Sequence, residues 1–282
     1  MIIAAIVVIA SISVSLYHPK TASEFELGTY AYVTQAGNTT LIVSTSSGSI
    51  IGKITGFHFP LAVAFSPSGA YAYIANGNNS ISIVNTTSRS ITGIITGFNT
   101  SHWPGAVSFS PSGAYAYVAT LGNTISIVNT SSKSIVGTIG GFQFADGVSF
   151  SPSGAYAYVS DGSNDTLAIV NTSSDSIVGI IGGLSSPGAV AIAPSGAYAY
   201  VTHRDGVSTF LSIVNTSSRS IVGTINVAPN LFDVAFSPSG AYAYVTYGGA
   251  NGFNNTISIV NTTSRSVKGV LKFGGEGVAF SP

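Results

Sequence analysis

A pair of tyrosines separated by one alanine recurs along the whole chain at intervals of 41 to 44 residues. The intervals between copies hold short runs of Val, Ile, Tyr, Phe and Thr, broken by Gly, Pro and Asn rather than patterned at helical spacing. A repeat of this length and composition is typical of a β-propeller, in which each repeat forms one four-stranded antiparallel blade. The six copies are Tyr30/Tyr32, Tyr71/Tyr73, Tyr115/Tyr117, Tyr156/Tyr158, Tyr198/Tyr200 and Tyr242/Tyr244.

The second repeat illustrates the strands and turns predicted for one blade. It predicts strands at 62–65, 70–75, 80–84 and 90–95. The segment Ser66-Pro67-Ser68-Gly69 joins the first two strands, with Pro fixing φ and Gly supplying positive φ. Asn85 opens the turn between the third and fourth strands, where its side chain can bond the backbone as an Asx turn. Period-two alternation in AYAYV puts the tyrosines on one face, where we expect them to pack between neighbouring blades.

The run GVSFSPSGAYAYV, followed by segments like TISIVNTSSKSIVGTI, resembles the YVTN-type β-propeller repeat, a family common in surface and secreted proteins of archaea and bacteria. The resemblance covers residues 28–282. The motif itself departs from the family's four letters, reading YVTQ at 32–35, YIAN at 73–76 and YVSD at 158–161. Where the family usually shows V-I-D-T, this chain has I-V-N-T, so a ring of acidic groups on that face is not expected.

The two chain ends predict how the ring closes. The first repeat lacks the FSP strand, whereas the last FSP strand, 277–282, has nothing after it. Together the incomplete ends make one whole blade, which predicts six four-stranded blades closed by one C-terminal and three N-terminal strands. The alternative is a fragment of a seven-bladed propeller.

The N-terminal residues 1–27 differ from the propeller at 28–282. The first 17 residues carry no charged side chain and predict a signal or anchor, with residues 2–17 available for the membrane. The first basic residue, Lys20, follows the apolar run instead of preceding it, unlike an ordinary signal peptide. A buried strand is the alternative to export.

Charged residues make up only 6% of the chain, and nine basic side chains balance nine acidic ones. Such a surface gives no electrostatic basis for binding nucleic acid. With no cysteine, the chain has neither disulfides nor thiolate metal sites, and the sequence suggests no metal and no cofactor.

The turns and loops at the two ends of the blades differ in how much their sequences vary. One end has nearly constant turns, PSGA and NTSS or NTTS, which predict a uniform surface of hydroxyls and amides. The other end has loops that vary in length and content, at 35–38, 161–165, 203–209 and 247–255. Because variable loops on a rigid scaffold usually carry recognition, this variable face is the predicted binding face.

Most unusual polar side chains fall on the variable face. Two pairs occupy repeated registers before FSP-type phenylalanines, and they predict a ligand site at the mouth of the channel: His58 with His102, and Asp146 with Glu276. A second group predicts a charged surface patch: His203, Arg204 and Asp205, with Asp161 and Asp165. Trp103 is a candidate for stacking on a sugar or anchoring a partner. The alternative is that all of them are isolated loop residues.

Ten N-x-S/T sequons occur, five of them in the I-V-N-T turns. In an exported chain these asparagines are glycosylation candidates, although turns use the same residues for structural reasons. They are Asn38, Asn78, Asn85, Asn99, Asn129, Asn164, Asn171, Asn215, Asn254 and Asn261.

No nucleophile elbow, HExxH motif or phosphate loop is present. The sequence therefore favours a non-enzymatic propeller, extracellular or at the cell surface, that contacts other surface proteins or glycans and is capable of self-assembly. The alternatives are a small-ligand or glycan-binding propeller, and a lactonase-like enzyme with its site at the channel mouth.

Overall fold

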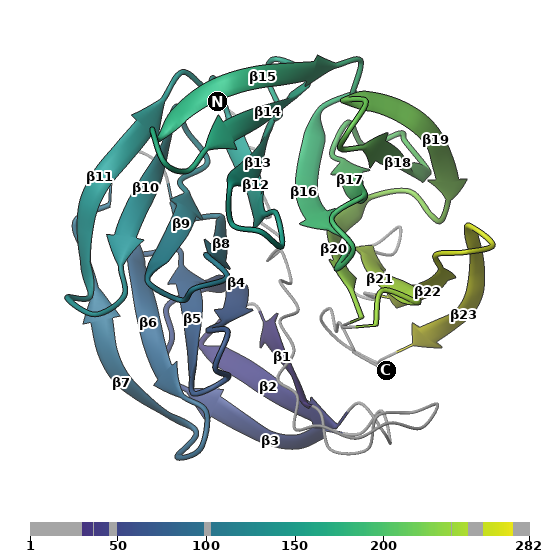
Figure 1. Ribbon diagram of the computed structural model, residues 1–282. Coiled ribbons are helices and arrows are strands. Elements are labelled where there is room, and N and C mark those ends of the chain that lie inside the picture. Colours follow the sequence, from purple (N-terminus) through teal and green to yellow (C-terminus); the bar gives the residue numbers. More distant parts are fainter. Residues whose placement is uncertain are drawn as a thin grey trace, which may run out of the picture.

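The computed structural model describes residues 30–35, 37–44, 50–98, 103–237, 239–247 and 256–272 (Figure 1). These residues form 23 β-strands, and none of them lies in a helix. The N-terminal segment 1–27 and the predicted closing strand 277–282 lie outside the described residues.

The strands fall into six antiparallel sheets, which are the blades. Blade 1 holds β1 (Tyr30–Gln35), β2 (Thr39–Ser44) and β3 (Ile50–Thr55), and blade 2 holds β4 (Pro60–Phe65), β5 (Tyr71–Asn76), β6 (Ser80–Asn85) and β7 (Ser90–Ile95). Blade 3 holds β8 (Ala106–Phe109), β9 (Tyr115–Ala119), β10 (Thr124–Asn129) and β11 (Ser134–Gly140). Blade 4 holds β12 (Ala145–Phe150), β13 (Tyr156–Asp161), β14 (Thr166–Asn171) and β15 (Ser176–Gly182). Blade 5 holds β16 (Pro187–Ile192), β17 (Tyr198–His203), β18 (Phe210–Asn215) and β19 (Ser220–Asn226), and blade 6 holds β20 (Leu231–Phe236), β21 (Tyr242–Tyr247), β22 (Thr256–Asn261) and β23 (Ser266–Lys272).

The blades lie around a common centre (Figure 1). In blades 2 to 6 the first strands, β4, β8, β12, β16 and β20, contact one another in succession, β1 of blade 1 contacts β4, and the last strands form the rim. Blades 2 to 6 have four strands each, and the described part of blade 1 has three. The predicted fold, an all-β propeller of six blades, is confirmed.

The turn chemistry expected from the sequence is also confirmed. Gly69 has a φ of 69°, and its backbone N–H donates to the carbonyl of Ser66 at 2.8 Å. Asn85 Oδ1 accepts from the backbone N–H of Ser88 at 2.9 Å, which is the expected Asx turn. Blades 2 to 6 each close these two hairpins with the same local hydrogen bonds.

In blades 1, 2, 3 and 5 the second tyrosine of the pair packs on a phenylalanine of the next blade. Tyr32 packs on Phe65 of blade 2 with ring centroids 4.7 Å apart, and Tyr73 packs on Phe109 of blade 3 at 4.6 Å. Burying such a ring contributes roughly 1.5–3 kcal/mol, and a tilted aromatic pair adds about 0.5–1.5 kcal/mol. The first tyrosine behaves differently, because Tyr71 stays 42% exposed. Only the second tyrosine of each pair is therefore a full core residue.

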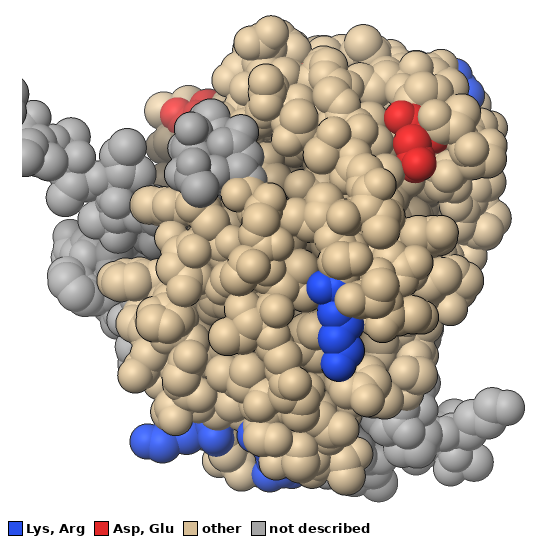
Figure 2. All heavy atoms as spheres, turned by 90° about the vertical axis from the view of Figure 1, so that its left-hand side faces the viewer, with Lys and Arg blue, Asp and Glu red and all other residues tan. Residues whose placement is uncertain are grey.

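The surface of the molecule carries little charge. Figure 2 shows isolated basic and acidic side chains on a side that is otherwise uncharged. This agrees with the 6% of charged residues in the sequence and leaves hydroxyls, amides and aliphatic side chains in contact with solvent.

Candidate functional site

The loops of the variable face are braced by the residue at the end of the second strand of each blade. In four blades this residue is polar and almost fully buried, with exposed fractions of 0 to 2%: Asn76, Thr120, Asp161 and His203. A buried polar side chain must be hydrogen-bonded to be tolerated. In three of these blades the partners lie in the loop that enters the blade.

Asp161 shows the arrangement most fully. Its two carboxylate oxygens accept backbone N–H groups of Gln143 at 3.0 Å and Phe144 at 2.9 Å, and Asn164 Nδ2 donates to it at 2.8 Å. In blade 2, Asn76 Oδ1 accepts the backbone N–H of His58 at 3.4 Å. Both side chains therefore fix the connection from one blade to the next.

His203 performs the same task in blade 5. Its Nδ1 lies 2.7 Å from the carbonyl oxygen of Ser185, and its Nε2 lies 2.9 Å from Ser212 Oγ. Since a carbonyl only accepts, Nδ1 carries the proton, and Nε2 accepts from the serine hydroxyl. The prediction that Asp161 and His203 belong to an exposed charged patch is wrong, because each is buried in a structural role.

Arg204 pairs with a residue that the sequence placed in a different group. Its Nε lies 3.1 Å from Asp146 Oδ2, so the ion pair joins blade 5 to blade 4. Asp146 is only 3% exposed. Burial raises the pKa of the Asp146 carboxyl, and the nearby Arg204 charge offsets part of that effect. Asp146 is therefore a buried interblade group rather than an open ligand at the channel mouth.

The two remaining acids of the predicted patch stabilise loops. Asp205 accepts the backbone N–H groups of Val207 at 3.0 Å and Ser208 at 2.7 Å. Burial alone would raise the pKa of Asp205, but these bonds and the hydroxyls of Ser208 and Ser185 outweigh it and lower the pKa. Asp165 accepts the backbone N–H of Ser186 at 2.7 Å. Charged residues gather here as predicted, but they are engaged in local bonds.

The predicted convergence at the channel mouth is not formed by the described residues. His58 is exposed on the β3–β4 loop, whereas Asp146 is buried against Arg204. His102 and Glu276 lie outside the described residues. The described part of the chain also contains no group of three residues able to hold a metal ion.

The central channel is a cavity of about 450 Å³ lined mainly by valine and alanine of the first strands. Ser108, Ser149 and Asp233 add polar groups. Asp233 is 5% exposed, and its Oδ1 accepts the backbone N–H of Val234 at 2.8 Å. Sequence reasoning missed Asp233, because it lies three residues before Phe236 and so does not share the register of Asp146, which lies four residues before Phe150.

Exposed apolar side chains project from the loops of the variable face. Phe59 is 62% exposed on the β3–β4 loop, Trp103 is 41% exposed before β8, and Val207 is 77% exposed on the β17–β18 loop. In an antiparallel blade, the connections from second to third strand and from fourth strand to the next blade emerge at the same end. The three side chains therefore lie on one face.

At the opposite end, the I-V-N-T turns form a second layer of hydrogen bonds. The threonine after each sequon asparagine ties the turn to the PSG turn of the same blade; Thr86 Oγ1, for example, donates to Gly69 O at 2.6 Å. The asparagines themselves are half-buried. Asn38, Asn78 and Asn164 are exposed on the variable face, and Asn99 and Asn254 lie outside the described residues. Glycosylation of the ten sequons stays a prediction.

Comparisons with known proteins agree on a propeller. The model of the LVIVD repeat, a repeat associated with β-propellers, matches residues 64–90, 106–142 and 146–182, less than half of the chain. The YVTN-type resemblance stays a prediction. No match to a curated protein was found. Among the described residues, no helix is long and apolar enough to span a membrane.

A chain of hydrazine synthase from Kuenenia stuttgartiensis has a similar structure, with a TM-score of 0.65 and 23% sequence identity. The match covers 76% of this chain and 66% of that one, so this chain corresponds to just under two thirds of the hydrazine synthase chain. At this identity the likeness concerns the fold alone.

Proposed function

We propose that the chain is a non-enzymatic interaction module that binds a partner protein or glycan through its variable face. The observation that carries this proposal is the combination of braced loops with exposed apolar side chains: Phe59 follows His58, which bonds Asn76, and Val207 bonds Asp205. Trp103 adds a third exposed side chain on the same face. Large apolar side chains held in water by a rigid framework are typical of recognition surfaces. The buried braces reduce the loop entropy that binding would otherwise cost.

Four titratable groups near the variable face support binding rather than catalysis. Asp161, His203 and Asp205 already hold backbone or hydroxyl partners, and Asp146 faces Arg204. A general base has to reach a substrate proton, and these groups are occupied in structural bonds. The likeness to hydrazine synthase supports the propeller fold and transfers no chemistry to this chain.

Site-specific crosslinking tests the proposed face. A photoreactive amino acid replaces Val207 on the variable face, and a matched variant carries it at exposed Ser131 on the opposite face. In the native cell we expect a discrete protein or glycan adduct from position 207 and none from position 131. Adducts formed equally from both positions, or only from 131, would contradict the proposal.

We also propose that the protein is exported to the cell surface, because the apolar segment 2–17, the low charge and the dense sequons suit an extracellular setting. Mass spectrometry of the native protein tests this proposal. The expected result is removal or anchoring of the N-terminal segment together with glycan mass on some of the sequons. Intact Met1 with unmodified Asn85 and Asn129 would overturn it.

A further inference from the structure

One position in the otherwise constant turns between third and fourth strands is charged. In five blades the turn reads N-T-S/T-S-x-S, and x adopts positive φ between 48° and 55°. The residues at x are Arg89, Lys133, Asp175, Arg219 and Arg265. The expectation of a uniform surface of hydroxyls and amides is therefore wrong at this register, which belongs neither to the variable loops nor to the channel.

Where x is arginine, its guanidinium lies in the cleft between its own blade and the preceding one. Arg265 of blade 6 sits over the ring of Tyr198 in blade 5, 5.6 Å from the ring centroid. A Cβ added at Gly179 in blade 4 would lie 3.0 Å from Arg219 Nη1 of blade 5. The glycine of the fourth strand thus leaves room for the arginine, which gains a cation–π contact with the aromatic wall.

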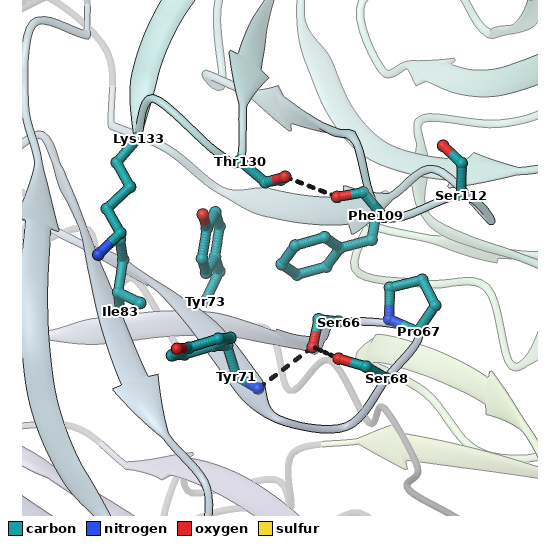
Figure 3. A pocket seen from close by; sticks show the side chains of 11 residues that line it. Ser66, Pro67, Ser68, Tyr71, Tyr73, Ile83, Phe109, Ser112, Thr130 and Lys133 are labelled. Atoms are coloured by element: carbon teal, nitrogen blue, oxygen red, sulfur yellow. Dashed lines mark hydrogen bonds between the residues drawn. The ribbon is translucent and has the colours of Figure 1, made fainter.

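The volume of the cleft is smaller where the side chain at x is larger. The cleft that contains Arg89 has a volume of about 240 Å³ and includes Tyr32 and Phe65 in its wall. The cleft at Lys133, shown in Figure 3 with Tyr71, Tyr73 and Phe109, measures about 360 Å³.

The cleft at Asp175, between blades 3 and 4, is larger, at about 510 Å³. Tyr115 in its wall is 43% exposed, whereas Tyr198, beneath Arg265, is half-buried. The cleft between blades 3 and 4 therefore keeps the aromatic wall but lacks the arginine that lies over the tyrosine in the cleft between blades 5 and 6.

Asp175 supplies a negative charge where other blades supply a positive one. The phenol of the buried Tyr117 donates a hydrogen bond to Asp175 Oδ1. Burial raises the pKa of Tyr117, and the adjacent carboxylate raises it further, so the phenol remains a donor. Within the described part of the chain, Asp175 forms no ion pair and no other hydrogen bond. Its second oxygen thus faces the cleft or solvent without a partner.

We propose that this cleft binds the guanidinium group of an arginine side chain presented by a partner protein. The ligand class follows from the chain itself, because blades 2, 5 and 6 place an arginine in the equivalent cleft, and Arg265 lies over the ring of Tyr198 there. The exposed ring of Tyr115 offers the cation–π surface, and Asp175 offers the carboxylate that a guanidinium prefers. The volume lies within the usual range for ligand pockets, roughly 300–1,000 Å³. The site lies at the opposite end of the blades from the proposed interaction face and does not depend on it.

NMR titration of the full chain with acetyl-arginine amide tests this site, with the neutral acetyl-citrulline amide as the matched probe. We expect arginine to bind at least about tenfold more tightly than citrulline, because a charge-assisted hydrogen bond and a cation–π contact together exceed about 1.4 kcal/mol. The shifted resonances should include Tyr115 and Tyr117. Equal binding of the two probes, or shifts confined to other clefts, would overturn the proposal.

Two variants complete the experiment. Asp175→Arg places in this blade the residue that blades 2, 5 and 6 already carry, so it should fold, fill the cleft and abolish arginine binding. Asp175→Asn keeps the size of the side chain and should weaken binding by about tenfold. Lys133→Arg, the same register in the adjacent blade, is the control and should bind arginine as the wild type does. Retained binding by folded Asp175→Arg, with an unchanged melting temperature, would refute the assignment.

Discussion

Single residues at the end of the second strands decide how rigid the variable face is. Asn76, Asp161 and His203 differ in chemistry, yet each bonds the loop that enters its blade. The backbone groups of those loops would otherwise be buried without partners, which is costly. The same position at the end of the second strand is therefore used in each of these blades. The side chain found there differs because the loop offers a different backbone group in each blade: an N–H group to Asn76 and Asp161, and a carbonyl to His203.

Asp161→Ala should destabilise the protein by about 2 kcal/mol, because it leaves the N–H groups of Gln143 and Phe144 without their acceptor. Asp161→Asn keeps one acceptor oxygen and should cost less. Urea denaturation of the two variants and the wild type measures the difference. Equal losses for Ala and Asn would show that the carboxylate does not brace the loop.

The stability of the protein should depend on pH through Asp146. Folding raises the pKa of this carboxyl above its ordinary 3.8, so its contribution is fully present in acid below that value and is lost as pH rises through the higher folded value. Asp146→Asn removes the buried charge, and Arg204, 29% exposed, can be solvated instead. We therefore expect the stability of the variant relative to wild type to increase from about pH 4 to pH 7.

Thermal denaturation across this pH range, run in parallel on Asp146→Asn and wild type, tests that expectation. Asp146→Ala, which also removes the hydrogen-bonding group, serves as the comparison. A stability advantage of Asn over wild type that shrinks toward neutral pH would contradict a raised pKa of Asp146 in the folded protein.

The sequence singled out these polar residues but not their structural partners. Asp146 and Arg204 are 58 residues apart, and only the packing of blade 4 against blade 5 brings them within 3.1 Å. Asp161 and His203 resemble loop residues because they adjoin variable segments. They are buried because the loop from the preceding blade packs over them. The sequence of a single repeat does not show this contact.

At the scale of elements, the spacing of the tyrosine pairs allowed the positions of the strands to be predicted. The second repeat predicted strands at 70–75 and 80–84, and the structure has β5 at Tyr71–Asn76 and β6 at Ser80–Asn85. Alternation and turn residues are local, so they predict strands well. The bulge in β12 between Ala145 and Val148 was not predicted, because neither the alternation nor the turn residues mark it.

The first strands of blades 4 and 5 approach each other closely at Gly147 of β12. A Cβ there would lie 2.7 Å from the carbonyl oxygen of Gly188 and 2.9 Å from the backbone nitrogen of Val190, both in β16. Since neither atom belongs to a flexible side chain, the blades would have to separate. Gly147→Ala should therefore cost about 1–3 kcal/mol.

Gly140 provides the matched control for this substitution. It ends the rim strand β11, and a Cβ there would meet nothing within 4 Å. Gly140→Ala should leave stability unchanged or raise it by up to about 1 kcal/mol through the unfolded chain. Differential scanning calorimetry compares the two variants, and similar melting temperatures for both would exclude a close contact at β12 and β16.

At the scale of the whole molecule, the rim is a set of sheet edges. In the described sheets the fourth strands pair on one side only, and β7, β11, β15 and β19 contain no charged residue. Figure 2 shows how little charge one side of the molecule carries. Charged side chains on edge strands are a common protection against pairing with other molecules, and here they are scarce.

The rim strand β15 is therefore the expected point of self-association. Its Val178 and Ile180 are 44% and 64% exposed, and the strand reads SIVGIIG, without charge or proline. Such an edge can extend its hydrogen-bonded ladder with the same strand of a second copy. Ile180→Lys places a charge where two such edges would meet, so it should abolish concentration-dependent association and leave the fold intact.

Sedimentation velocity at increasing protein concentration measures the effect. Ser131→Lys adds the same charge at an exposed turn away from the edge and should associate as the wild type does. Because apolar contacts and backbone hydrogen bonds drive this pairing and the formal net charge is zero, association of the wild type should depend little on added salt. If both lysine variants lose association equally, net charge rather than the β15 edge controls self-assembly, and the rim plays no specific part.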